Sequence, residues 1–203
     1  MKKQVLMIHG GTTFNSYESY IKYLENREVN LDYFKKQKSW KDNFANKLGE
    51  DFEILEPRMP NATYAHYGEW KIWLTRMIPF LKDGVVFIGH SLGGIFLARY
   101  FSENVFPKKI KAVVLIAPPF DNVSNEEELS DFSLPETMEK FPEQVKNIYL
   151  LQSKDDPVVP YEEMEKYKKI LPNAETVLFE NMGHFNTETF PELLDLIKKI
   201  SQK

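Results

Sequence analysis

Six short runs rich in Val, Ile and Leu punctuate the chain, and they constrain its fold more than any other feature. They are Val5 to Ile8, Phe52 to Leu55, Val85 to Ile88, Ala112 to Ala117, Ile148 to Gln152 and Thr176 to Phe179. Runs that are apolar at successive positions are typical of strands buried on both faces, as in a parallel sheet. We therefore predict about six strands in one mainly parallel sheet.

The segments between these runs carry apolar residues at helical spacing. Such spacing places an apolar stripe on one face of a helix, as for Trp70, Trp73, Leu74, Met77, Ile78 and Leu81, and again for Phe190, Leu193, Leu194, Ile197 and Ile200. The first stripe predicts that Trp73 is buried. Strands alternating with helices predict a doubly wound α/β fold, with helices on both faces of the sheet and right-handed crossovers.

Two connections are longer than the others. Tyr17 to Leu48 holds two helical patterns, the second with Ser39 as N-cap, and Glu28 to Lys38 joins them. The stretch from Phe120 to about Lys146 is irregular, which predicts a short excursion or a small lid. With 203 residues, of which 42% are hydrophobic, the chain is predicted to form one domain over residues 1–203.

Composition excludes several classes of function. A formal net charge of -4 gives no reason to expect a nucleic-acid partner, because phosphate contacts need clustered Lys and Arg. No apolar stretch approaches the roughly 20 residues of a membrane helix, and the first run lacks a signal-peptide cleavage site. The lack of cysteine excludes disulfides and thiolate catalysis. We expect a cytoplasmic protein without a membrane partner, and the sequence predicts no oligomeric state.

A Gly-x-Ser-x-Gly motif closes the third run. Gly89-His90-Ser91-Leu92-Gly93 directly follows Val85 to Ile88, as in a nucleophile elbow, where a strand turns sharply into a helix and exposes a serine. The turn strains the serine backbone, and small neighbours leave room for it. In the simpler alternative the serine only caps a helix. The preceding strand favours Ser91 as a nucleophile.

A serine hydroxyl needs a general base within hydrogen-bond reach. The chain has four histidines, and His184 directly follows the last apolar run. The carboxyl ends of parallel strands share one edge of the sheet, so loops after different strands can meet there. We therefore predict His184 as the base, and we expect structural or lining roles for His9 and His90.

The base needs an acid that holds its tautomer, and this acid should follow the fifth run. Asp155 and Asp156 compete there. We favour Asp156 because it directly precedes Pro157, where the chain turns sharply. In the simpler alternative both aspartates only initiate that turn.

The oxyanion of a tetrahedral intermediate needs backbone donors. The motif assigns one donor to the residue after the nucleophile, here the amide of Leu92. The second is expected from the loop after the first run, where His9-Gly10-Gly11-Thr12-Thr13 lets the backbone approach a ligand. We choose Gly11, with Thr12 as the alternative. The loop by itself is also compatible with an ordinary strand-to-helix turn.

In chain order these residues resemble the α/β-hydrolase superfamily, in which the serine precedes the acid and the histidine comes last. Asp155-Asp156-Pro157 and Gly183-His184-Phe185-Asn186 look like the small serine hydrolases of the YdeN and retinoblastoma-binding-protein type. The resemblance covers nearly the whole chain. It implies a compact α/β-hydrolase fold that lacks the superfamily's first two strands. This fold would carry a short cap. The stretch from Tyr17 to Leu48 is longer than such relatives need, so their substrate preference is not carried over.

These features predict a serine hydrolase that cleaves a small carboxylic ester or amide through an acyl-enzyme. Phe120 and Phe185 are expected to face this small-molecule substrate. No histidine pair stands at metal-ligand spacing with a supporting carboxylate, and no phosphate or dinucleotide motif is present, so no metal or cofactor is predicted. The alternative is a binding or scaffold protein that has the hydrolase fold without meaningful turnover.

Overall fold

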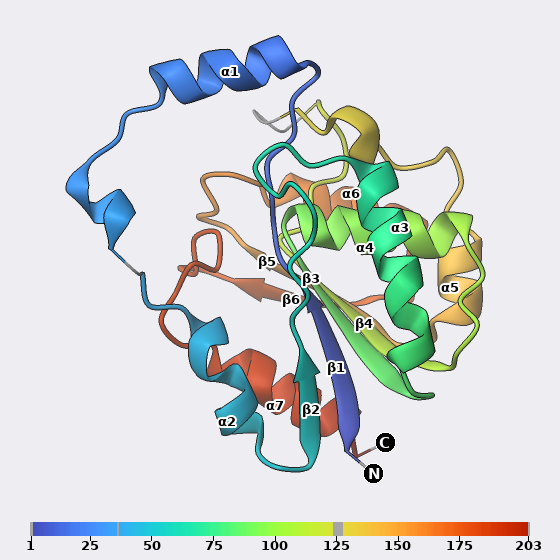
Figure 1. The fold of residues 1–203 in the computed structure, drawn as a ribbon. Coiled ribbons are helices and arrows are strands. Elements are labelled where there is room, and N and C mark those ends of the chain that lie inside the picture. The colour runs from blue at the N-terminus through green and yellow to red at the C-terminus, as the bar shows by residue number, and fades with distance from the viewer. Residues whose placement is uncertain (1, 36, 124–127, 203) are drawn as a thin grey trace.

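One parallel sheet of six strands forms the centre of the structure, a computed structural model that describes residues 2–35, 37–123 and 128–202. The strands are β1 (Lys3–Ile8), β2 (Phe52–Leu55), β3 (Val85–His90), β4 (Ile110–Ile116), β5 (Ile148–Ser153) and β6 (Glu175–Phe179). They lie in the order β2-β1-β3-β4-β5-β6, and every pair is parallel (Figure 1). The six predicted strands and their parallel arrangement are confirmed.

Each face of the sheet has its own core, because successive strand residues point to opposite faces. Phe87 packs on the face covered by α3 (Tyr67–Met77), α4 (Leu92–Glu103), α5 (Lys140–Gln144) and α6 (Glu162–Ile170). Its neighbour Ile88 packs on the opposite face, against α2 (Phe44–Leu48) and α7 (Pro191–Ile200). Figure 1 shows α2 and α7 across the sheet from α3 and α4. The predicted doubly wound α/β fold, with helices on both faces, is confirmed.

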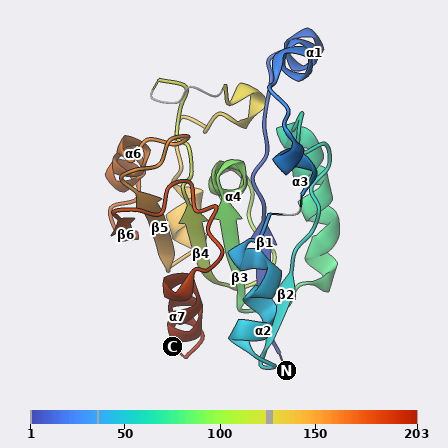
Figure 2. The same cartoon turned by 90° about the vertical axis from the view of Figure 1, so that its left-hand side faces the viewer.

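The first long connection extends beyond the carboxyl edge of the sheet. Helix α1 (Tyr17–Asn26) has no buried residue and stands away from the sheet in both views (Figures 1 and 2). A short 3-10 helix, η1 (Leu31–Phe34), follows it, and the chain rejoins the core at a second, η2 (Trp40–Asn43). Ser39 caps η2 as predicted, since its hydroxyl accepts a hydrogen bond from the Lys41 amide.

The second long connection is a short excursion that packs on the core. It contains η4 (Ser130–Phe132) and α5, while residues 124–127 lie outside the described part of the chain. Phe132 and Phe141 are fully buried, and the Phe132 ring meets that of Trp70 edge to face, with ring centroids 5.2 Å apart.

In the described ranges no helix is long and apolar enough to span a membrane.

The buried face of α3 is narrower than its apolar stripe. Trp70 and Leu74 are fully buried, but Trp73 is 42% exposed, so the prediction that Trp73 is buried is wrong. At 3.6 residues per turn, Tyr67 and Leu74 lie about 60° and 40° to one side of Trp70, whereas Trp73 lies about 60° to the other side. Trp73 therefore sits at the border of the core. The helix ends at Met77 and continues as η3 (Ile78–Phe80).

The two tryptophans of α3 provide a matched test of this packing. We expect Trp70→Ala to lower the free energy of unfolding by about 3 to 5 kcal/mol, because it empties a fully buried site. Trp73→Ala should cost about 1 kcal/mol, since much of its ring already contacts water. Urea denaturation of both variants measures the difference. Equal losses would contradict the burial assigned to this helix.

Candidate active site

Ser91 occupies the sharp turn between β3 and α4. Its φ of 55° and ψ of -123° place a non-glycine residue in a strained backbone region. The Ser91 amide donates a hydrogen bond of 2.8 Å to the carbonyl of Ile116 in β4. A Cβ atom at Gly93 would lie 2.5 Å from the carbonyl oxygen of Ile8, so α4 can start this close to β1 only with glycine there. The backbone thus has the form expected of a nucleophile elbow.

His184 and Asp156 meet above the carboxyl ends of β5 and β6. Nδ1 of His184 lies 2.9 Å and 3.0 Å from the two carboxylate oxygens of Asp156. The amides of Val158 and Val159 donate to Oδ1 of Asp156 at 2.9 Å and 3.0 Å. The carboxylate is therefore held in place by backbone donors and faces the imidazole, which fixes both the orientation and the tautomer of His184.

Asp155 has different partners from those of Asp156. One of its carboxylate oxygens accepts hydrogen bonds from the Ser153 hydroxyl at 2.5 Å and the Gly183 amide at 2.9 Å. These bonds hold the pKa of the Asp155 carboxyl below its usual range. The structure thus brings Asp156, the favoured aspartate, against His184. Asp155 instead braces the loop that precedes His184.

Phe185 anchors the other side of that loop. Its ring is fully buried and packs against Phe179 and Phe190, while its carbonyl accepts a hydrogen bond of 3.0 Å from the indole of Trp40. The prediction that Phe185 faces the substrate is therefore wrong. Its φ of 56° turns the chain so that His184 lies at the surface of the site and Phe185 points into the core.

Ser91 and His184 line one open cavity of about 340 Å³. Gly10, Gly11 and Thr12 after β1 also line it, as do Lys41, His90, Val158 and Asn186. In the described residues no hydrogen bond joins the Ser91 hydroxyl to His184, and such bonds are often long before a substrate is bound. Lys41 is a charged residue of this cavity that the sequence motifs did not reveal.

The loop after β1 lies directly against Ser91. A Cβ atom at Gly10 would lie 3.2 Å from the Cβ of Ser91, so a side chain here would crowd the serine. The amide of Thr12 already donates to the Ala62 carbonyl at 2.8 Å. Across the described part of the chain, the amides of Gly11 and Leu92 have no acceptor. This difference favours Gly11 over Thr12 as a second donor beside Leu92.

His9 supports this loop. Its Nε2 accepts a hydrogen bond of 2.9 Å from the Met59 amide, so Nδ1 carries the proton and donates to the carbonyl of Gly10 at 2.6 Å. Both ring nitrogens are engaged, and the ring meets Trp70 edge to face. His9 is therefore a neutral histidine that positions backbone.

His90 connects β3 to the loop of His184. Its Nε2 lies 3.0 Å from the carbonyl oxygen of His184, and its Nδ1 lies 3.4 Å from Nζ of Lys41. Because an ammonium can only donate, Nδ1 accepts and the proton resides on Nε2, which donates to the carbonyl. Burial lowers the pKa of His90 well below 6.5, and the charges of Lys41 and His184 lower it further.

This buried neutral histidine predicts a pH-dependent stability. Below about pH 6.5 the unfolded chain takes up a proton at His90 and the folded chain does not, so the free energy of unfolding should fall by up to about 1.4 kcal/mol per pH unit. His90→Gln keeps a donor and an acceptor but cannot titrate. Urea denaturation between pH 8 and pH 5 should therefore give the variant a shallower slope, and parallel slopes would contradict the prediction.

Phe120 is partly buried, and its ring packs edge to face on Tyr167 with centroids 5.0 Å apart. Contact between Phe120 and a substrate stays a prediction.

Within the ranges that the structure describes, no group of three or more His, Asp or Glu side chains could hold a metal ion.

A family model and a curated relative both match this chain, and both are described as serine hydrolases. Residues 34–198 match the family model described as serine hydrolase. The rat protein "Serine hydrolase RBBP9" is 27% identical over 157 residues, which cover 73% of this chain and 78% of the rat protein.

Solved structures share the fold at low sequence identity. The ydeN gene product from B. subtilis superimposes with a TM-score of 0.75 at 19% identity, and the match covers 100% of both chains. A putative yden-like hydrolase from Pectobacterium atrosepticum gives a TM-score of 0.66 at 17% identity, covering 98% of this chain and 91% of that one. These likenesses support the compact α/β-hydrolase fold that the motifs implied.

Proposed function

Because the chain belongs to the serine hydrolase family and is therefore an enzyme, we propose that it cleaves small carboxylic esters or amides with Ser91 as the nucleophile, His184 as the base and Asp156 as the acid. The observation that carries the proposal is that Ser91, in a strained turn, shares a cavity with a histidine held by a buried aspartate. A cavity of about 340 Å³ lies at the small end of ligand sites, which favours small substrates.

The proposed reaction has two halves. In the first, Oγ of Ser91 attacks the carbonyl carbon while its proton passes to Nε2 of His184. The tetrahedral intermediate then collapses, the bond to the leaving group breaks, and His184 returns the proton to the leaving oxygen or nitrogen. In the second half, water attacks the carbonyl carbon of the Ser91 ester and gives a proton to His184. The bond to Oγ then breaks and His184 returns the proton to Oγ, which releases the acid and restores the serine.

The protein contributes charge stabilisation at two points. The Asp156 carboxylate faces Nδ1 of His184 and stabilises the imidazolium that forms during attack. The amides of Gly11 and Leu92, with no acceptor in the described residues, would donate to the oxyanion. One such donor is worth roughly 3 to 4 kcal/mol of transition-state stabilisation.

Covalent labelling tests the proposal directly. A fluorophosphonate probe should label the wild-type protein, and mass spectrometry of the digested protein should place the adduct on Ser91. Preincubation with p-nitrophenyl esters of increasing acyl length should slow labelling most for the preferred acyl group. An adduct on another serine would refute the assignment, and a folded protein without any adduct would favour a binding or scaffold role.

A further inference from the structure

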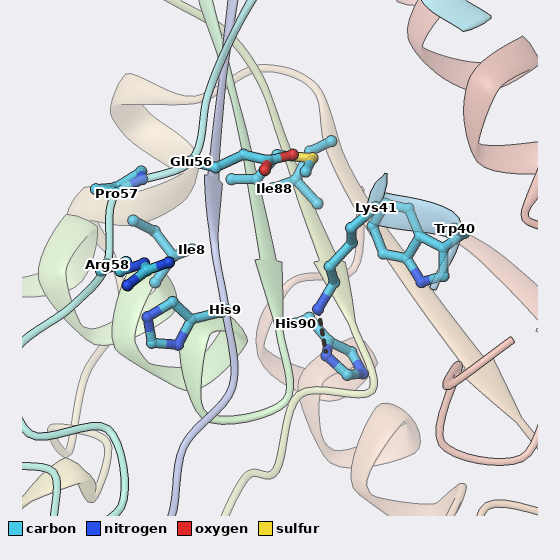
Figure 3. Close-up of a pocket in the computed structure, with 10 residues that line it drawn as sticks. Ile8, His9, Trp40, Lys41, Glu56, Pro57, Arg58, Ile88 and His90 are labelled. Carbon is cyan, nitrogen blue, oxygen red and sulfur yellow. Dashed lines mark hydrogen bonds between the residues drawn. The ribbon is translucent and has the colours of Figure 1, made fainter. Parts of the chain in front are cut away.

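A second cavity, of about 210 Å³, adjoins the site of Ser91. It lies between the ends of β1 and β3, and residues 56–58 after β2 and Lys41 in η2 enclose it (Figure 3). Lys41 and His90 line both cavities, and His90 directly precedes Ser91. The two cavities are therefore neighbours, and a substrate bound at Ser91 would reach the second cavity past Lys41 and His90.

The charged lining of this cavity is positive. It has two cations, Lys41 and Arg58, and one carboxylate, Glu56. His9 and His90 also line it, but both are held as neutral tautomers by the hydrogen bonds described above. The side chains leave an excess of one positive charge, which a single carboxylate group of a ligand would neutralise.

The ammonium of Lys41 has spare hydrogen-bonding capacity. It has three donors. In the described residues it contacts the neutral His90 ring and lies over the Trp40 ring, 5.3 Å from its centroid, but it forms no ion pair. Burial lowers the pKa of Lys41, and the attraction to Glu56 opposes this shift only in part. An anion beside Lys41 would supply the missing partner.

The guanidinium of Arg58 is exposed and engages no hydrogen bond or ion pair with the part of the chain that the structure describes. In Figure 3 it lies beside His9, at the wall across the cavity from Lys41. The apolar side chains of Met7, Ile88 and Trp40 form other parts of the cavity lining. A ligand with a short hydrocarbon chain and a terminal charge fits this combination of walls and cations.

We infer that the second cavity is a carboxylate subsite, and that the enzyme prefers esters or amides whose acyl chain carries a carboxylate some atoms away from the scissile carbonyl. The inference rests on the proposed function, because it takes Ser91 as the point of attack. Lys41 and Arg58 would bind the carboxylate, and Glu56 would limit the subsite to singly charged groups.

A matched pair of substrates isolates the charge. Mono-4-nitrophenyl adipate and its methyl ester have nearly the same shape, and only the first carries a carboxylate. We expect wild-type kcat/KM to be about tenfold higher for the charged ester, as a partly buried charge-assisted contact allows. The series of hemi-esters from succinate to suberate then locates the best chain length.

Charge variants assign the preference to residues. The readout is the ratio of kcat/KM for the charged ester to that for the neutral ester, which cancels general damage to the site. Arg58→Gln and Lys41→Gln should each lower this ratio about three- to tenfold, and Glu56→Gln should raise it. Lys47→Gln, which removes an exposed lysine from α2, controls for net charge and should leave the ratio unchanged.

The outcomes separate the two proposals. If the enzyme hydrolyses both esters with equal kcat/KM and the variants do not change the ratio, the carboxylate subsite is refuted and the proposed function stands. If wild type hydrolyses neither ester and no probe labels Ser91, the proposed function fails. Calorimetric titration with monomethyl adipate, which carries one carboxylate, then still tests the subsite: tighter binding to wild type than to Arg58→Gln supports it, and equal or absent binding overturns it.

Discussion

Ser91→Ala should lower kcat/KM for p-nitrophenyl butyrate by at least about 10⁴-fold, leaving only the catalysis that binding and the oxyanion donors supply. The change removes only the hydroxyl group, whose oxygen attacks the carbonyl carbon. Alanine keeps the Cβ atom and therefore the same backbone strain at φ 55°. We thus expect the free energy of unfolding to change by less than about 1 kcal/mol.

A serine within α4, the helix that follows Ser91, provides the control. Ser102 is buried, and its hydroxyl donates to the carbonyl of Ala98 at 2.7 Å. Ser102→Ala removes the same hydroxyl from within α4, so it should cost about 1 kcal/mol of stability and leave kcat/KM near the wild-type value. Full esterase activity in folded Ser91→Ala protein would rule out Ser91 as the nucleophile.

The four central strands were predictable because a strand buried on both faces needs apolar residues at nearly every position. The edge strands β2 and β6 are only partly buried, and they were found from their short Val-, Ile- and Leu-containing runs and from the alternation with helical segments. The turn at Ser91 was predictable for a related reason. Gly93 packs directly on the Ile8 carbonyl, and such a contact leaves a glycine at a fixed offset in the sequence. Local sterics of this kind can be recognised without knowing the rest of the fold.

Residues whose role depends on the path of a loop were harder to assign. Asp155 and Asp156 have the same chemistry and adjacent positions, and only hydrogen bonds to Val158, Val159 and Gly183 separate their roles. Phe185 follows the predicted base, but its positive φ sends its ring into the core. A sequence pattern does not encode such a turn at a residue other than glycine.

Contacts between segments far apart in the chain could not be predicted from the sequence. Lys41 and His90 are 49 residues apart, and although Ser39 marks the start of a helical segment, no motif links Lys41 to the site. Its position depends on Trp40, whose buried indole anchors η2 to the carbonyl of Phe185. The charged cavity beside Ser91 therefore emerges only from the packed structure.

Asp156→Asn should lower kcat/KM for the same ester by about 10³- to 10⁴-fold while the fold is retained, because it would invert the tautomer of His184. Two backbone amides, from Val158 and Val159, point at Oδ1 of Asp156. The oxygen of an asparagine must therefore take the Oδ1 position, which places its NH₂ group at Oδ2, 2.9 Å from Nδ1 of His184. Nδ1 also lies 3.0 Å from the Oδ1 position, but an oxygen there already accepts from two backbone amides. We therefore expect Nδ1 to accept from the nearer NH₂ group, which moves the proton to Nε2.

A histidine with its proton on Nε2 cannot accept the proton of Ser91. Asp155→Asn is the matched control, since it changes the same atoms one residue away and disturbs only the bonds to Ser153 and Gly183. We expect it to cost about tenfold or less, with the rate of fluorophosphonate labelling following kcat/KM in both variants. An equal loss in the two variants would mean that the aspartates act together by holding the loop, and the acid would then have no direct role on His184.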